Sequence, residues 1–114
     1  MSKCEIIFYQ TRSGKNPLLD FIKKLSSKDQ AKIAWIIGLL AEHGRFLPLP
    51  YLKSLSNADN IYELRPKNYR IFLSFLQRKN VILLHAIIKK TNKTPQKELS
   101  LASKRLKDYL ERSI

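Results

Sequence analysis

The eight residues from Val81 to Ile88 constrain the fold more than any other part of this 114-residue chain. They are almost all apolar at both odd and even positions, whereas a strand with one wet face alternates apolar and polar residues. We therefore expect a strand inside a sheet, covered on both faces. The segment Tyr69–Leu76 precedes it, and the four polar residues 77–80 between the two predict an antiparallel hairpin.

The residues before this hairpin predict one strand and two helices. Glu5–Tyr9 has the β-branched and aromatic composition of a strand. Asn16 followed by Pro17 predicts the start of a helix, and a capping box at 27–30 predicts the start of a second one. Gly44 suits the end of the second helix. The two predicted helices have apolar stripes and form an antiparallel hairpin; the stripes are Leu18, Phe21, Ile22 and Leu25, and Ile33, Ile36, Ile37 and Leu40.

The remaining segments complete the prediction. Prolines predict an extended segment over 46–50, followed by strands over Tyr51–Leu55 and Ile61–Arg65 with turns at 56–60 and 66–68. Thr94-Pro95 predicts the cap of a C-terminal helix with an inner face of Leu99, Ala102, Leu106 and either Tyr109 or Leu110. The element order predicts an α+β fold in one domain, residues 1–114. We expect a mostly antiparallel sheet of about four to five strands, with an N-terminal helical hairpin and a C-terminal helix.

The chain carries a large excess of positive charge, because 22 Lys and Arg against 9 Asp and Glu give a net charge of +13. This excess favours a polyanionic partner, with nucleic acid first and an acidic protein second. The lone cysteine, Cys4, cannot form an internal disulfide, and no segment resembles a signal peptide or a membrane span. We therefore expect a cytoplasmic protein with no membrane partner. His43 and His85 are too isolated to predict a metal site unless carboxylates join them, and no cofactor is expected.

Basic residues gather on the predicted strands or at their ends, at Lys53, Arg65, Arg70, Lys89 and Lys90. Alternation along a strand places Glu63 on the face of Arg65, and Phe72 and Ser74 on the face of Arg70. In the last strand it places Leu83, His85, Ile87 and Lys89 on one face. If the three faces coincide, they form a cationic cluster of Arg65, Arg70, His85 and Lys89. The alternation leaves the register between the strands open.

Such a cluster suits a phosphodiester. Arginine binds two phosphate oxygens with its planar fork, lysine acts as a mobile charge, and both can stabilise a phosphorane. RNA supplies its own nucleophile, the 2′-hydroxyl, so the four cluster residues are our catalytic candidates. His85 is the expected proton shuttle, with a lysine of depressed pKa as the alternative. The residues expected to bind the RNA are Lys53, Lys67, Lys90 and Lys93.

Several of these residues also have a structural interpretation. His85 can be a hydrogen-bonded packing residue, and Arg70 can be purely structural. Glu63 is expected to be an internal ion-pair partner of Arg65 or Arg70 rather than a base. The basic residues of the C-terminal helix are expected on its solvated face: Lys97, Lys104, Arg105 and Lys107.

The same strands carry motifs that resemble a known family. Lys53-Ser54-Leu55, Ile61–Arg65 and Tyr69–Phe72 are similar to the central strands of RelE/HigB-type toxins. Residues 83–95, which end in Lys-Lys-Thr-Asn-Lys-Thr-Pro, resemble the strand-to-helix motif of the phage-associated HigB-like branch. Ala86 and Ile87 stand where that branch has Gly-Phe, and Asn92 where Gln is common, so no charged group is lost. The C-terminal tyrosine of some relatives has no clear equivalent, because Tyr109 lies within a predicted helix.

The resemblance implies a RelE-like fold and the toxin of a type II toxin–antitoxin pair. Such toxins cut mRNA on the ribosome by attack of the 2′-hydroxyl, and an antitoxin, here expected to be of the helix-turn-helix type, silences them. The polar positions that match the family are Lys53, Arg65, Arg70, His85, Lys89 and Lys90. Two other functions remain open: a non-catalytic basic module that binds an antitoxin or nucleic acid, and a ParE-like gyrase inhibitor. The Lys-Lys-Thr-x-Lys-Thr-Pro motif favours the mRNA-cleaving toxin over the gyrase inhibitor.

Overall fold

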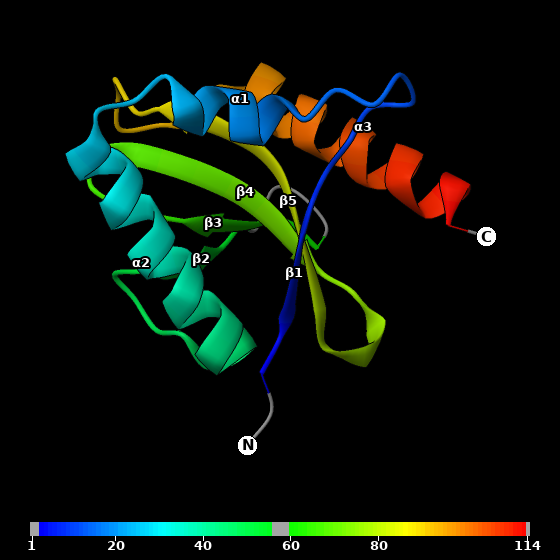
Figure 1. Ribbon diagram of the computed structural model, residues 1–114, viewed down its shortest axis with the longest axis horizontal. Helices are drawn as coiled ribbons and strands as arrows, with labels where there is room; N and C mark the ends of the chain where they lie inside the picture. Colours follow the sequence, from blue (N-terminus) through cyan, green and yellow to red (C-terminus); the bar gives the residue numbers. More distant parts are fainter. Residues whose placement is uncertain (1–2, 56–59, 114) are drawn as a thin grey trace.

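The computed structural model describes residues 3–55 and 60–113, which form a five-stranded sheet between helices (Figure 1). The strands are β1 (Glu5–Phe8), β2 (Leu52–Ser54), β3 (Tyr62–Leu64), β4 (Tyr69–Phe75) and β5 (Asn80–Ile88). Their order across the sheet is β1-β5-β4-β3-β2. β1 pairs with β5 in parallel, and the other neighbouring pairs are antiparallel. The predicted α+β fold with a mostly antiparallel sheet is therefore confirmed, and it agrees with a RelE-like architecture.

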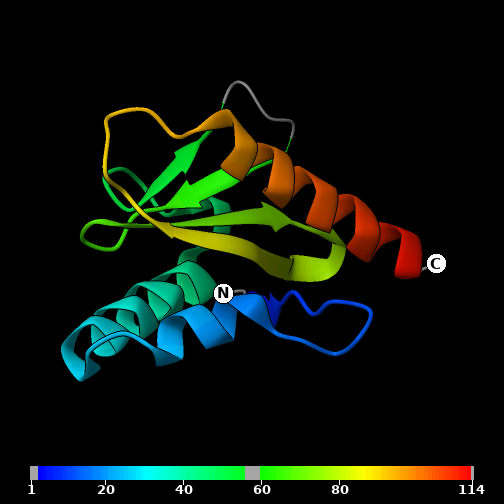
Figure 2. The same ribbon diagram turned by 90° about the horizontal axis from the view of Figure 1, so that it is seen from above.

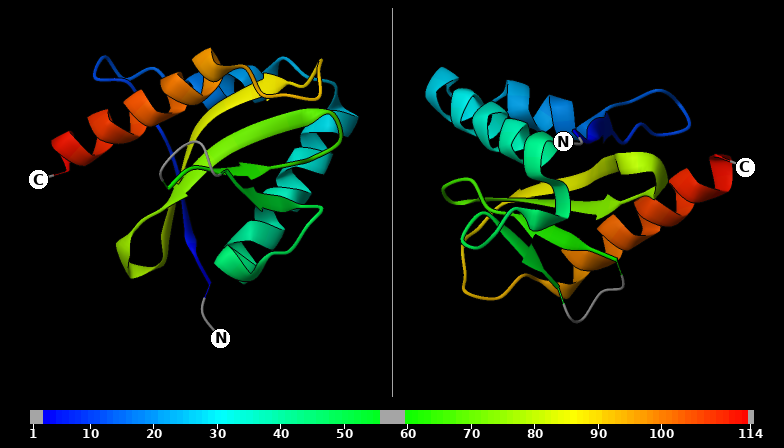
Figure 3. Two further views of the ribbon diagram at one scale, coloured as in Figure 1. Left: turned by 180° about the vertical axis from the view of Figure 1, so that it is seen from behind. Right: turned by 90° about the horizontal axis from the view of Figure 1, so that it is seen from below.

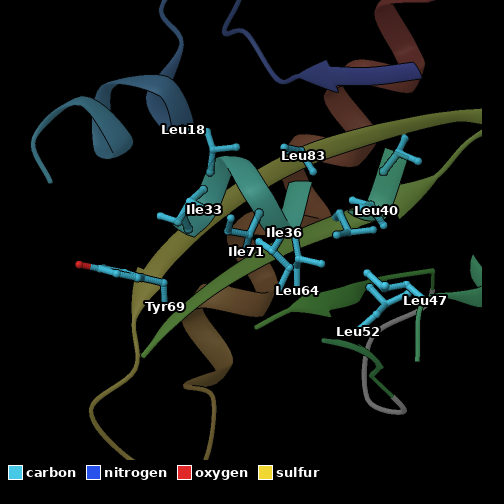
Figure 4. Close-up of a cluster of buried hydrophobic side chains, with 13 residues drawn as sticks. Leu18, Ile33, Ile36, Leu40, Leu47, Leu52, Leu64, Tyr69, Ile71 and Leu83 are labelled. Atoms are coloured by element: carbon cyan, nitrogen blue, oxygen red, sulfur yellow. The ribbon is translucent and has the colours of Figure 1, made fainter. Parts of the chain in front are cut away.

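The helices cover both faces of the sheet (Figures 2 and 3). α1 (Pro17–Lys23) and α2 (Ser27–His43) lie on one face, the α1/α2 face, and α3 (Gln96–Arg112) lies on the other, the α3 face. On the α1/α2 face, Ile36 and Leu40 pack in one apolar core with Ile71 and Leu83 (Figure 4). A second core lies under α3 and includes Leu84. The apolar pattern of β5 thus has the predicted consequence, a strand inside the sheet with both faces covered.

A register shift in β5 changes the predicted alternation of its side chains. Leu73 of β4 pairs with Leu83, but the next residue back along β4, Phe72, pairs with His85, so Leu84 is an extra residue on β5. An extra residue of this kind, a β-bulge, reverses the face on which the later side chains lie. His85 therefore lies on the α3 face with Phe72, and the prediction that Leu83 and His85 share a face is wrong.

The predicted capping residue is confirmed for α1, whereas the cap of α2 lies one residue earlier than predicted. Asn16 caps α1 through its side-chain oxygen, as predicted. α2 is capped by Ser26, whose hydroxyl accepts a hydrogen bond from the backbone N–H of Asp29 at 3.2 Å, so the predicted cap at Ser27 is wrong. Gln30 does not close a capping box, because its amide donates instead to carbonyl groups at and just after the end of α1. The side chain of Gln30 thereby joins the two helices.

The end of α2 is followed by a turn and not by the extended segment predicted for 46–50. Gly44 ends α2 with a φ of +57°, and a Cβ at this position would lie 2.9 Å from the sulfur of Cys4. Gly44–Phe46 then forms a short 3-10 helix. The carbonyl of Pro48 accepts hydrogen bonds from the backbone N–H groups of residues 51 and 52. Proline opposes a regular helix, but its carbonyl is free to close a turn.

Three further predictions concern connections and the last helix. The predicted turn at 56–60 lies, apart from Asn60, outside the described residues. The loop between β4 and β5 contains a 3-10 turn over Gln77–Lys79, and Asn80 already belongs to β5. In α3, Tyr109 packs against the second core, whereas Leu110 is exposed. Tyr109 therefore completes the predicted inner face.

Candidate nucleic-acid interface

The segment Lys89–Pro95, which connects β5 to α3, borders an open hollow of about 700 Å³ that we call the basic groove. Its other walls come from β2, from the end of β3 and from the start of α3. The described residues that line it include four cationic side chains and one carboxylate: Lys53, Arg65, Lys89, Lys93 and Glu63. Four of the predicted basic residues, from separate parts of the sequence, thus meet around one hollow. Their excess positive charge suits a polyanion.

Glu63 is the buried acid of the basic groove, with 4% of its surface exposed. Its Oε1 lies 3.4 Å from Nε of Arg65 and 3.7 Å from Nε of Arg70. The hydroxyl of Thr94 donates a hydrogen bond to the other carboxylate oxygen at 3.1 Å. The predicted role of Thr94 as a helix cap is wrong, because α3 begins after Pro95 without a side-chain cap. Thr94 instead fastens the segment before α3 to β3.

Two guanidinium groups share this one carboxylate, so the cluster keeps an excess of positive charge. The Nε atoms of Arg65 and Arg70 are buried and have no hydrogen-bond partner among the described residues. The Arg65 side chain is 26% exposed and lines the basic groove, whereas that of Arg70 is 9% exposed. Arg65 is therefore the better placed of the two to meet a ligand.

Arg70 holds the turn that precedes β4. Its Nη1 donates hydrogen bonds to the backbone carbonyls of Lys67 at 3.1 Å and of Tyr69 at 2.7 Å. Burial lowers the pKa of Arg70, repulsion from Arg65 adds to this, and Glu63 opposes it. Arginine remains charged even when burial lowers its pKa. The carboxylate of Glu63 and the two backbone carbonyls therefore offset the cost of burying the charge of Arg70. The structure thus places Arg70 as a buried support of the Glu63–Arg65 pair.

His85 is held on both sides by residues of α3. Its Nε2 lies 2.7 Å from Oε1 of Glu98, and its Nδ1 lies 3.3 Å from Nη1 of Arg105. The ring also stacks on Phe72, with 6.1 Å between centroids. Burial lowers the pKa of His85, the bond to Glu98 opposes this, and the charge of Arg105 adds to it. A neutral ring that donates from Nε2 and accepts at Nδ1 satisfies both neighbours.

Arg105 has a structural role that the sequence prediction missed. The sequence predicts Arg105 on the solvated face of α3, but this residue is half-buried, and its Nη1 donates a hydrogen bond to the carbonyl of Leu84 at 2.8 Å. The prediction of a solvated Arg105 is therefore wrong. Glu98, Ala102 and Arg105 stand four and then three residues apart, which places them on one face of a helix. That spacing is a sequence signal for the pair of charged residues around His85.

Of the predicted RNA-binding lysines, Lys67 and Lys90 do not line the basic groove, and Lys67 lies beside α2. Nζ of Lys67 donates a hydrogen bond to Asp29 of α2 at 2.8 Å, and the hydroxyl of Tyr69 donates to the same carboxylate at 2.5 Å. These two bonds lower the pKa of Asp29. Lys67 thus joins the turn before β4 to α2 and does not line the basic groove.

A second hollow, of about 530 Å³, lies beside the last residues of β5, and we call it the edge groove. Lys90 and His85 line this groove. The segment 89–95 separates it from the basic groove, and Lys89 and Lys93 border both. The structure therefore distributes the predicted site residues over two adjoining hollows.

Within residues 3–55 and 60–113, no cluster of His, Cys, Asp and Glu side chains has the size needed to hold a metal ion. None of the helices in the same part of the chain is long and apolar enough to cross a membrane.

The fold and the grooves define a small basic α+β protein of RelE-like architecture. Residues 20–107 match the family model of the phage-derived protein Gp49-like family (DUF891), and the chain belongs to this family. The family is associated with the toxins of toxin–antitoxin pairs. No curated protein matches the chain.

Proposed function

We propose that the chain is the toxin of a type II toxin–antitoxin pair, of the HigB-like branch, and that it cuts mRNA on the ribosome in the cytoplasm. The observation that carries this proposal is the basic groove, whose described lining includes four cationic side chains and a single buried carboxylate. A groove of this charge attracts the phosphates of RNA. A helix-turn-helix antitoxin would be the partner that silences the protein.

The proposed reaction needs no covalent protein nucleophile. The 2′-oxygen of the RNA attacks the adjacent phosphorus and its proton passes to water, while Arg65 binds the oxygens that gain charge in the phosphorane. The bond from phosphorus to the 5′-oxygen then breaks, and the ammonium group of Lys89 donates a proton to the leaving oxygen. The products are a 2′,3′-cyclic phosphate and a free 5′-hydroxyl.

The remaining residues divide between binding and positioning. Lys53, Lys93 and, across the segment 89–95, Lys90 would neutralise flanking phosphates. Arg70 would position Arg65 through Glu63, because both guanidinium groups face the same carboxylate. His85 would position the end of β5, because both of its ring nitrogens face α3 residues.

The purified protein mixed with ribosomes that carry a defined mRNA tests the proposal. We expect cleavage within the mRNA, with cyclic phosphate ends detected by their resistance to alkaline phosphatase before acid treatment and their sensitivity to it afterwards. The same mRNA without ribosomes is the control for ribosome dependence. Intact mRNA after binding to the protein would favour the non-catalytic basic module instead.

A further inference from the structure

The sheet has an edge that its own strands leave uncovered. β1 pairs with β5 only from Asn80 to Leu83, and no strand among the described residues pairs with 84–88 on that side. In Figure 2 this part of β5 faces the viewer between α1 and α3. An open strand edge is a template for another extended chain, and folded proteins usually cover or protect it.

The hydrogen bonds of β5 show which backbone groups point to the open edge. The N–H of Lys89 donates to the carbonyl of Asn68, so this residue pair is bonded towards β4. Bonded and non-bonded pairs alternate in an antiparallel ladder. The N–H and C=O groups of Ala86 and Ile88 therefore point away from β4, towards the open edge. Beside them the carbonyl of Leu84 accepts a hydrogen bond from the side chain of Arg105. At this carbonyl a side chain thus takes the place that the backbone of a neighbouring strand would otherwise occupy.

The edge groove runs along these same residues and has a distinct chemical character. Its apolar lining includes Phe21 of α1, Ile88 and Pro95, and the residue Ile88 is 43% exposed. Four lysines surround it: Lys89, Lys90, Lys93 and Lys97. The one carboxylate among its described lining residues, Glu98, already faces His85. The groove thus offers backbone groups, an apolar contact and uncompensated positive charge.

We propose that the open edge of β5 binds an extended acidic peptide segment of a partner protein, which adds a strand to the sheet at Ala86 and Ile88. Backbone hydrogen bonds would hold the segment, apolar side chains at alternate positions would contact Ile88 and Phe21, and acidic side chains would face the lysines. The proposal rests on the antitoxin partner of the proposed function and names where that partner docks. Because Lys89 and Lys93 border both grooves, the bound segment would also oppose RNA binding.

A synthetic fluorescent peptide of alternating glutamate and valine tests the proposal with the full-length protein. We expect saturable binding, together with slower hydrogen exchange at the amides of Ala86 and Ile88. The same peptide with N-methylated backbone positions keeps its charge but loses its strand hydrogen bonds, and it should bind about tenfold more weakly or worse. Equal binding of the two peptides would overturn the proposal.

Two protein variants separate the charge from the strand edge. The double variant Lys90→Glu/Lys97→Glu should weaken peptide binding by about tenfold. Lys107→Glu, an exposed charge reversal on α3 away from both grooves, is the matched control and should bind like the wild type. Ile88→Pro removes an N–H that points to the open edge without removing a β4 bond, and it should also weaken binding. Equal loss in the Lys107→Glu protein would overturn the site.

A single-stranded uridine oligonucleotide distinguishes the other class of ligand. We expect it to leave the amides of Ala86 and Ile88 unprotected. If the oligonucleotide protects them and the acidic peptide does not, the edge is a nucleic-acid site and the proposal is wrong. Peptide docking is measured without ribosomes or RNA cleavage, so its failure is distinguishable from a failure of the proposed function.

Discussion

The two faces of the sheet differ in what they bury. The buried side chains in the core of the α1/α2 face are aliphatic, apart from Tyr69. By contrast, the buried polar and charged residues of the described chain, Glu63, Arg70 and Ser74, all lie on the α3 face, together with the mostly buried His85. Buried charge is costly unless it is paired, so a protein rarely places it where apolar packing would serve. Both faces therefore bury an apolar core, but the α3 face also encloses the buried charged residues, and we expect the functional groups on that face.

The largest expected effect is on the α1/α2 face. Leu83 is fully buried there, and Leu83→Ala should lower the free energy of unfolding by about 3 kcal/mol, through lost apolar burial and the cavity left behind. Urea denaturation measures this loss. Leu110→Ala makes the same chemical change at an exposed position of α3 and should cost less than about 0.5 kcal/mol. A Leu83→Ala protein as stable as the control would contradict the burial of Leu83 in the core of the α1/α2 face.

The next effect is on activity rather than stability. Arg65→Ala should reduce the rate of mRNA cleavage on ribosomes by about 100-fold, because a cation that stabilises the phosphorane is lost. Arg12→Ala, which removes an exposed arginine paired with Asp108, is the control and should cleave at the wild-type rate. Thermal unfolding checks that both proteins are folded. Undiminished cleavage by folded Arg65→Ala protein would show that the site lies elsewhere.

Arg70 should behave as a structural residue despite its charge. Arg70→Met removes a partner of Glu63 and leaves two backbone carbonyls without their donor, which should cost about 2 kcal/mol of unfolding free energy. Arg78→Met, at an exposed position between β4 and β5, serves as the comparison and should be close to neutral. If Arg70→Met kept full stability and lost cleavage, Arg70 would belong with Arg65 as a catalytic residue.

The smallest expected effect is a pH dependence. Burial lowers the pKa of His85, so the folded protein holds its neutral form and the unfolded chain binds the proton more tightly. The unfolding free energy that depends on neutral His85 is therefore fully present above the pKa of histidine in the unfolded chain, which is about 6.5. It is lost as the pH falls from there towards the lower pKa of His85 in the folded protein. His85→Asn cannot titrate. Between pH 7.5 and 5.5 it should lose less unfolding free energy than the wild type in parallel urea titrations, and an equal loss would contradict the role of His85.

Local patterns were sufficient to predict most elements of the fold. The apolar residues of β5 predict that helices cover both of its faces, because any strand with two apolar faces needs cover on both. The sequence predicts the cap of α2 at Ser27, one residue after the observed cap at Ser26, because the two serines have the same capping chemistry and only the backbone geometry distinguishes them.

The arrangement of the site was less predictable, because it depends on contacts between distant residues. The bulge at Leu84 inserts an apolar residue among apolar neighbours, so the alternation in the sequence does not reveal it. Arg70 faces Glu63 of the neighbouring strand β3, and the bond from Thr94 to Glu63 joins residues 31 positions apart. Neither contact has a local pattern in the sequence. The grouping of Arg65 with Lys53, Lys89 and Lys93 likewise depends on the path of the segment 89–95.

The extra residue in β5 makes the site sensitive to the number of residues as well as to their identity. Removal of Leu84 by an in-frame loss of one codon would keep every charged group but restore an unbroken alternation along the strand. His85 would stay opposite Phe72 on the α3 face, but the second core would lose the side chain of Leu84, and Arg105 would lose the carbonyl to which it donates. A homologue with a one-residue gap at this point would therefore keep the face on which His85 lies, but it would lose the backbone anchor of Arg105 even if it kept every basic residue of the site.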